Sequence, residues 1–284
     1  MVVTDNISKI REIRWADPAA TWGLVPTMGY LHSGHLALVA AAAAENDFTA
    51  VTIYVNPTQF APTEDLSSYP RDLERDLSLL EAAGVDLVFT PSDAVMYPDG
   101  FQTKVEVTEL SQRQEGASRP THFAGVTLIV AKLFNIIQPT RAYFGQKDAQ
   151  QTIVLKRMVG DLNFNLELIV RPTVREADGL AMSSRNKYLS PEQREAAVVL
   201  HHALTLAERM IADGERDANK IRTLMTERIA AEPLARLDYI SIADRGTLEE
   251  IDTAAGEILI SLAVFFGQTR LIDNVMIDVG EGES

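Results

Sequence analysis

The chain has 284 residues, enough for one large domain or two ordinary domains with a full hydrophobic core. A formal net charge of −14 repels phosphate backbones, so nucleic acid is not expected as a partner. The same net charge is compatible with a local basic pocket that binds a small anion. The absence of cysteine excludes disulfides, thiolate nucleophiles and cysteine-rich zinc sites. The sequence shows no secretory signal, and no apolar run approaches the ~20 residues of a membrane span, so we expect a cytoplasmic protein with no membrane partner.

Along the first 170 or so residues, short apolar runs alternate with helical patterns. The spacing predicts strands over 21–26, 48–56, 85–91, 141–145 and 167–172, and helices over 35–46, 71–84 and 121–138. Strands that alternate with helices pair in parallel. We therefore expect a Rossmann-like, doubly wound α/β domain over residues 1–173.

The pattern changes in the remainder of the chain. Ser190, Pro191 and Gln193 form the sequence signature of a capping box that opens a helix over 190–214. A second helix is expected over about 217–231, followed by strands over 237–244, 256–267 and 269–277. This order predicts a smaller α+β domain over residues 174–284.

The stretch PTMGYLHSGH, residues 26–35, joins the first of these strands to its helix. Ser33 or Gly34 is expected to cap the helix, whose N–H groups and dipole then favour an anion at the turn. His32 and His35 would lie beside that anion and stay near neutrality. The alternative is two surface histidines near a helix start. The HxGH spacing is the signature of the nucleotidylyl-transferase superfamily, which includes class I aminoacyl-tRNA synthetases.

Three other polar segments follow predicted strands or join the domains. Gln59, in VNPTQF, offers an amide suited to a hydroxyl or carboxylate. Lys147, in FGQKDAQQ, places a positive charge at the start of a helix. A positive charge there does not stabilise the helix dipole, so binding of a phosphate explains this lysine better than a structural role. Gln151 follows about one helical turn later. The segment MSSRNKYLS combines hydroxyls with positive charge and could hold a polyphosphate. The alternative for Gln59 is a polar loop residue without a ligand, and the alternative for Lys147 is a structural role. The alternative for MSSRNKYLS is a plain linker between the domains.

Together these segments resemble the pantothenate synthetase family, the pantoate–β-alanine ligases. The resemblance covers nearly the whole chain, with PTMGYLHSGH, VNPTQF, YPRDLERDL, MYPDG, RPTHFAGV, YFGQKDAQQ, PTVREADGLAMSSRN and DYISI in the family's order. It implies ATP-dependent condensation of pantoate with β-alanine to pantothenate. Pantoate first attacks the α-phosphate of ATP to form pantoyl adenylate and pyrophosphate, and β-alanine then displaces AMP. The resemblance also implies Mg²⁺ and a homodimer.

The resemblance assigns roles to residues of this chain. His35 matches the proton donor and His32 its companion, and the other residues implied in catalysis are Lys147, Arg185, Ser183 and Ser184. The implied nucleotide contacts are Met28, Gly29, Tyr30, Leu31, His32, Ser33, Gly34, His35, Gly145, Gln146, Lys147, Asp148, Val174, Met182, Ser183, Ser184 and Arg185. Gln59 and Gln151 match the substrate glutamines, and Val126, Ile129 and Val130 match the apolar wall beside pantoate. Residues 61–75 resemble the family's gate, and 182–185 resemble the KMSKS loop of the synthetases.

The chain departs from the family pattern at two places. Many relatives carry glutamate where this chain has Gln146, which removes one acid from the site. Relatives often carry two adjacent acids near the magnesium, whereas this chain has Arg75 and Asp76, so Asp76 alone can match a metal ligand.

Three other functions compete with the ligase. An adenylyltransferase of the same superfamily would leave the nucleotide on its product, but such chains are usually shorter and lack NPTQF together with KDAQQ. An aminoacyl-tRNA synthetase is disfavoured by the acidic charge. A nucleotide-binding regulator that lost the chemistry would not need the paired histidines, Lys147 and MSSRN.

Overall fold

The computed structural model describes residues 1–62 and 64–280, and the chain forms two compact units. The first comprises Met1–Gln146 and Gln150–Pro172, and the second comprises Lys147–Ala149 with the chain from Thr173 onward. The three residues Lys147–Ala149 group with the second unit, and Asn274 Nδ2 donates a hydrogen bond to Lys147 O at 2.9 Å. The sequence had placed them in the first domain, and the domain limits at 173/174 stay a prediction.

The first unit is built on a six-stranded sheet in which every described pairing is parallel, in the order β1-β4-β3-β2-β5-β6. Its strands are β1 (Val2–Thr4), β2 (Trp22–Thr27), β3 (Phe48–Ile53), β4 (Leu87–Phe89), β5 (Arg141–Gly145) and β6 (Glu167–Arg171). Apolar and β-branched residues fill β2 and β3, as expected for strands buried on both faces. The predicted Rossmann-like α/β class is confirmed.

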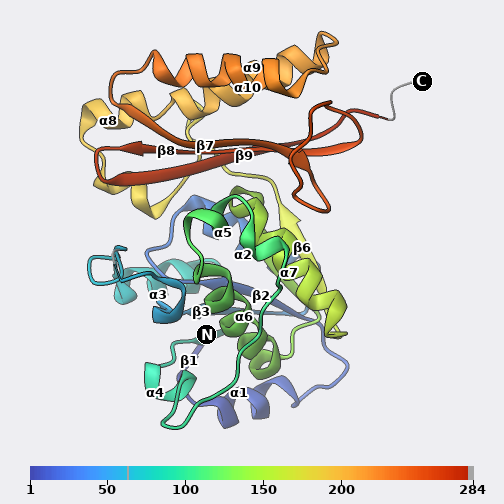
Figure 1. The fold of residues 1–284 in the computed structure, drawn as a ribbon. Helices are drawn as coiled ribbons and strands as arrows, with labels where there is room; N and C mark the ends of the chain where they lie inside the picture. The colour runs from blue at the N-terminus through green and yellow to red at the C-terminus, as the bar shows by residue number, and fades with distance from the viewer. Residues whose placement is uncertain (63, 281–284) are drawn as a thin grey trace. The chain divides into compact units, whose positions relative to one another are not determined.

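Helices cover both faces of this sheet, and Figure 1 shows their order along the chain. On one face Ile10, Phe134 and Leu155 join a core from α1 (Ile7–Arg14), α6 (His122–Ile137) and α7 (Ala149–Asp161). A second core includes Val39 from α2 (Ser33–Glu45) and Leu80 from α3 (Leu73–Ala82). Since alternate strand residues enter the two cores, the two sets of helices lie on opposite faces.

Short helical segments lie in the connections of the chain. They are η1 (Pro57–Gln59), α4 (Asp93–Met96), η2 (Leu110–Gln112), α5 (Glu115–Ser118), η3 (Gln146–Asp148) and η4 (Ser184–Tyr188). The strand β1, the helix α1 and the short helices α4 and α5 were not expected from the sequence.

The order of the parallel strands reverses between β2 and β5, which are neighbours in the sheet. The chain runs from β2 outward to β3 and β4 on one side, and from β5 to β6 on the other. The loop after Thr27, at the end of β2, therefore leaves the sheet at the switch point where open α/β sheets bind ligands.

The second unit has a three-stranded antiparallel sheet in the order β7 (Ala235–Asp244), β8 (Glu257–Phe266) and β9 (Thr269–Asp278). The helices α9 (Val199–Ala212) and α10 (Ala218–Ala230) pack side by side against it (Figure 1). This confirms the smaller α+β unit.

The capping box at Ser190 and Gln193 forms as predicted, with bonds of 3.0 and 3.2 Å. The single helix expected over 190–214 is wrong, because α8 (Pro191–Ala196) and α9 are separate. Between them Val198 N donates to Glu195 O and Leu200 N to Ala197 O, so tighter i→i+3 bonds replace the α-helical pattern.

Candidate functional site

The segment Met28–His35, which we call the histidine turn, begins directly after β2. Gly29 has φ +83° and Tyr30 has φ +52°, so two successive residues lie in the left-handed region. Gly29 N donates to Thr27 Oγ1 at 3.2 Å. A β-carbon at Gly29 would meet Ile53 Cγ2 at 3.0 Å and Asp76 Oδ2 at 3.1 Å, so both the backbone conformation and the limited space favour glycine here.

The two imidazoles of the histidine turn face each other, with ring centroids 4.0 Å apart. His32, and not Ser33 or Gly34 as expected, caps α2: its Nδ1 accepts from Gly34 N at 3.1 Å. His35 Nδ1 in turn accepts from His32 N at 3.3 Å, so the two rings form a reciprocal capping box. Because each Nδ1 accepts a hydrogen bond, each neutral ring carries its proton on Nε2.

Asp76, on the first turn of α3, is 1% exposed and binds the histidine turn through both carboxylate oxygens. Its Oδ2 accepts from Tyr30 N at 2.6 Å and its Oδ1 from Leu31 N at 2.8 Å. Arg75 Nη1 lies 3.4 Å from Oδ1, and Arg75 Nη2 donates to Leu31 O at 2.9 Å. Burial raises the pKa of Asp76, and the two N–H donors and Arg75 oppose that rise.

The surroundings of Asp76 do not fit a resident Mg²⁺, the ion for which the sequence proposed this residue. Mg²⁺ requires near-octahedral oxygen ligands, whereas N–H donors face both oxygens of this buried carboxylate. Among residues 1–62 and 64–280, no group of three His, Cys, Asp or Glu side chains could hold a metal ion.

Gln59, at the end of η1, points its amide at the histidine turn: Nε2 lies 3.2 Å from Met28 Sδ. Its Oε1 accepts from Asn56 Nδ2 at 3.2 Å. Asn56 is 1% exposed, also donates to Gly125 O at 3.2 Å, and accepts from Tyr97 Oη at 2.7 Å. The sequence reasoning missed Asn56, whose position as the last residue of the strand predicted over 48–56 was the available signal.

The carbonyl oxygen of Gln59 is held by His122 and Arg119, two side chains that the sequence reasoning also missed. His122 Nδ1 lies 2.9 Å from it, and Arg119 Nη2 donates to it at 3.4 Å. Arg119 forms a two-point ion pair with Glu64 at 2.6 and 2.8 Å. Burial first, and then the Arg119 charge, lower the pKa of His122 to about 4, so this ring is neutral at pH 7.

The three predicted wall residues Val126, Ile129 and Val130 are buried on α6 within the first core. Gln151 is partly buried at the start of α7. Its neighbour Gln150 is buried and donates to Leu110 O and Arg113 O at 2.8 and 2.7 Å, so Gln150 holds the preceding loop.

In the second unit, Lys147 and Ser183 line one small cavity of about 10 Å³ together with Asn186 and Asp273. Ser183 caps η4 by accepting from Arg185 N at 3.2 Å. The structure thus brings two of the predicted phosphate-binding segments together. Asn186 and Asp273 were not predicted.

A hairpin-like segment supports this loop. Met182 N donates to Val174 O at 3.0 Å, and Arg175 forms a two-point pair with Asp273 at 2.6 and 3.0 Å. Asp273 is 1% exposed, so this pair is largely removed from water. That the Lys147 cavity and the histidine turn act on one nucleotide stays a prediction.

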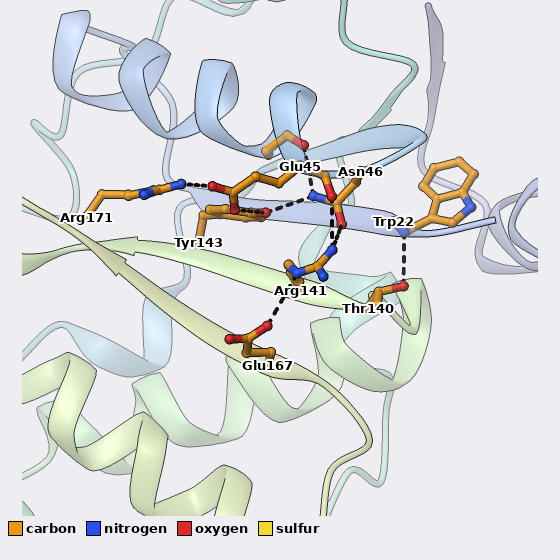
Figure 2. A network of polar contacts seen from close by, with 9 residues as sticks. Trp22, Glu45, Asn46, Thr140, Arg141, Tyr143, Glu167 and Arg171 are labelled. Atoms are coloured by element: carbon orange, nitrogen blue, oxygen red, sulfur yellow. Dashed lines mark hydrogen bonds and ion pairs between the residues drawn. The ribbon is translucent and has the colours of Figure 1, made fainter.

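A polar network holds the C-terminal end of α2, the helix that starts at His32 (Figure 2). Tyr143 Oη donates to Glu45 Oε2 at 2.9 Å and accepts from Asn46 Nδ2 at 2.8 Å. Arg171 also pairs with Glu45, and Arg141 Nη1 donates to the Glu45 carbonyl at 2.9 Å. The arginines complement the negative end of the helix dipole and fix the helix on β5 and β6.

A cavity of about 650 Å³ lies at the opposite, amino-terminal edge of the parallel sheet, where Thr140, Arg141 and Glu167 line it. None of the predicted site residues lines it. In the part of the chain that the structure describes, no helix is long and apolar enough to cross a membrane.

The fold and the histidine turn define an α/β protein of the class that binds anionic ligands at the switch point of a parallel sheet. The family model described as "Pantoate-beta-alanine ligase" matches residues 2–276. The chain therefore belongs to the pantoate-beta-alanine ligase family, as its motifs predicted.

Relatives and solved structures agree with this membership. The chain is 59% identical over 257 residues to a pantothenate synthetase of Acetivibrio thermocellus, covering 90% of this chain and 92% of the relative. It superposes on the pantothenate synthetase of Thermus thermophilus with TM-score 0.93 and 47% identity, covering 99% and 100% of the two chains. The Francisella tularensis pantoate-beta-alanine ligase, complexed with β,γ-ATP and β-alanine, matches with TM-score 0.79 and 35% identity over 97% of each chain.

Proposed function

We propose that this chain condenses pantoate with β-alanine to pantothenate at the expense of ATP, through a pantoyl adenylate. The family match over residues 2–276 supports the reaction, and the Francisella relative complexed with β,γ-ATP and β-alanine supports the substrates. A carboxylate does not react with an amine at neutral pH, so it must first gain a good leaving group. Adenylation supplies AMP as that leaving group and releases pyrophosphate.

The first step brings two anions together, and the histidine turn is suited to lowering that barrier. Nδ1 of His32 and of His35 is engaged in capping α2, so the Nε2–H edge of each ring is the one that can donate to a phosphate oxygen. Such donors stabilise charge where it develops in the transition state. We assign the nucleotide to the turn, with His35 as proton donor and His32 as its companion.

The second unit carries the cationic and hydroxyl groups that the family resemblance assigns to the nucleotide. Lys147 and Ser183 line one cavity. Next to Ser183 in the chain, Met182 N donates a hydrogen bond to Val174 O. We assign Lys147, Ser183, Ser184 and Arg185 to the phosphates. Mg²⁺ enters as part of the metal–ATP substrate, since the described residues offer it no resident site.

Pantoate is assigned to the space beside Gln59, with Gln151 as the second amide and Val126, Ile129 and Val130 as the apolar wall. The amide of Gln59 lies 3.2 Å from Met28 of the histidine turn, which supports a substrate bound next to the nucleotide. We propose residues 61–75 as a gate over this space. Residue 63 of that segment lies outside the described residues.

By the same family resemblance we propose a homodimer and a cytoplasmic location. Light scattering in solution tests the homodimer: a mass of one chain of 31.3 kDa would contradict it. Fractionation of the source cells tests the location.

The observation that carries the proposed reaction is the pair of imidazoles 4.0 Å apart at the switch point of the sheet. The test is pantoate-dependent exchange of labelled pyrophosphate into ATP. We expect exchange in the parent protein and a loss of ~10²–10³ in His35→Ala and in Lys147→Ala. The matched controls are His202→Ala and Lys156→Ala, whose side chains lie outside the proposed site.

The same assay separates the competing functions. No exchange by folded, ATP-binding protein would favour a nucleotide-binding regulator. A complete reaction that yields pyrophosphate without AMP would favour an adenylyltransferase. The double variant of His35 and Lys147 tests whether both act on one nucleotide: a joint loss no larger than the greater single loss supports this, whereas multiplied losses contradict it.

A further inference from the structure

Asp76 is the buried acidic group that contacts the histidine turn from a distant part of the chain. Its two oxygens accept from Tyr30 N and Leu31 N at 2.6 and 2.8 Å, across 46 and 45 residues of sequence. These two donors directly precede His32. The carboxylate therefore binds the backbone on which the imidazole pair is built.

The turn needs such support because its backbone is unfavourable by itself. Gly29 and Tyr30 have φ of +83° and +52°, and a non-glycine residue in the left-handed region persists only when its surroundings hold it there. Hydrogen bonds from N–H groups to an ionised carboxylate are among the strongest that a backbone can make. Asp76 supplies two of them at the strained position.

Arg75 compensates the charge of Asp76 and also binds the backbone of the histidine turn. Its Nη1 lies 3.4 Å from Asp76 Oδ1, and its Nη2 donates to the carbonyl of Leu31 at 2.9 Å. The guanidinium also lies over the Tyr30 ring, at 5.4 Å from the centroid. The start of α3 thus contacts the turn through backbone N–H, backbone C=O and an aromatic side chain.

We propose that Asp76 is a positioning residue that fixes the histidine turn, and through it the spacing of the His32 and His35 imidazoles. The sequence had offered Asp76 as a metal ligand, and the N–H donors that face both of its oxygens argue against that role. The expected effect of Asp76 on the reaction rate rests on the proposed function. Its effect on the position of the two imidazoles does not depend on which reaction the protein catalyses.

The test compares Asp76→Asn with Asp217→Asn. Asp217 caps α10 in the second unit by accepting from Asn219 N and Lys220 N at 2.9 and 3.1 Å, and it belongs to none of the proposed binding segments. Asparagine at 76 replaces one acceptor with an NH₂ group that faces an N–H donor. The readouts are imidazole NMR resonances of the full chain, assigned among its five histidines, and pyrophosphate exchange as a function of ATP and Mg²⁺.

In Asp76→Asn we expect shifted His32 and His35 resonances, unshifted His201 and His202 resonances, and exchange at least ~10-fold slower at saturating Mg²⁺. The Mg²⁺ concentration for half-maximal exchange should equal that of the parent. Asp217→Asn, which keeps an N-cap side chain on α10, should resemble the parent in every readout. Gly29→Ala, which perturbs the same turn while keeping the carboxylate, should reproduce the resonance shifts even if Asp76→Asn does not fold.

Unshifted His32 and His35 resonances in folded Asp76→Asn, or recovery of its exchange by raised Mg²⁺, would overturn the proposal. If Asp76→Asn does not fold, unshifted resonances in Gly29→Ala would do the same. If the parent shows no pantoate-dependent exchange, the proposed function fails, and the resonances still decide whether Asp76 fixes the imidazoles.

Discussion

Gly125 on α6 offers a direct way to move Gln59 without changing Gln59 itself. A β-carbon built at Gly125 lies 2.5 Å from Thr58 O and 2.6 Å from Gln59 N, which are backbone atoms and cannot rotate away. Ordinary contact begins at 3.4 Å, so the η1 segment must shift by about 0.9 Å in Gly125→Ala. Asn56, which donates to Gly125 O, is expected to move as well.

Gly125→Ala has two opposing effects on the free energy of unfolding, overpacking and a gain in helix propensity. Of these, only the overpacking moves Gln59 and so affects activity. Overpacking costs about 1–3 kcal/mol, whereas alanine gains about 1 kcal/mol of helix propensity over glycine. The net expectation is a loss of about 1–2 kcal/mol in the free energy of unfolding. A displacement near 1 Å at a substrate-positioning residue costs about 10²-fold in rate, so pyrophosphate exchange should fall by that order.

Urea denaturation measures the first effect, and pyrophosphate exchange on the folded protein measures the second. The control is Gly160→Ala, in helix α7, where nothing lies within 4 Å of the added carbon. That variant should be at least as stable as the parent and equally active. The reasoning is refuted if Gly125→Ala behaves like Gly160→Ala, or if it loses stability while exchange by the folded fraction is unchanged.

Three further outcomes follow from buried polar groups. His122 has a pKa of about 4 against 6.5 in the unfolded chain, so the unfolded state binds more protons between these values and stability should fall by up to about 3 kcal/mol as pH drops from 6.5 to 4; in denaturation series against pH, His122→Asn should lack this component of the slope. Arg175→Ala leaves the buried Asp273 carboxylate unpaired and should cost about 3–5 kcal/mol in urea denaturation, whereas Arg157→Ala, which removes an exposed pair, should cost under about 1 kcal/mol. Tyr143→Phe removes the hydroxyl between Glu45 and Asn46 and should cost about 1–3 kcal/mol in the same assay; no loss would show that the network does not stabilise α2.

Much of the fold was predictable because its longer elements carry strong periodicity. The apolar runs that form β2 and β5, and the helices α2 and α6, lie within a few residues of their predicted bounds. The strand β1 has three residues, too few for a period to be recognised. The break between α8 and α9 was missed because Ala197 and Val198 continue a helical pattern in the sequence and depart from it only in hydrogen bonding.

The candidate site was predictable where a motif lies within one short segment. The histidines and the residues of MSSRN were found in this way, but their partners were not. Asp76 lies 45 residues from Leu31, and Arg119 lies 60 residues from Gln59, and nothing in the local pattern of either residue states which backbone group it contacts. Such contacts arise from the tertiary packing of α3 and of the segment that joins α5 to α6, so they required the structure.

The reciprocal cap at the start of α2 links folding and chemistry through the same two rings. Serine, threonine or asparagine could also begin this helix, but each would remove an imidazole from the proposed nucleotide site. Conversely, any change that draws either δ-nitrogen toward a ligand would remove one hydrogen bond from the first turn of the helix. A substitution at either histidine therefore changes both a hydrogen bond at the start of the helix and a group of the proposed site.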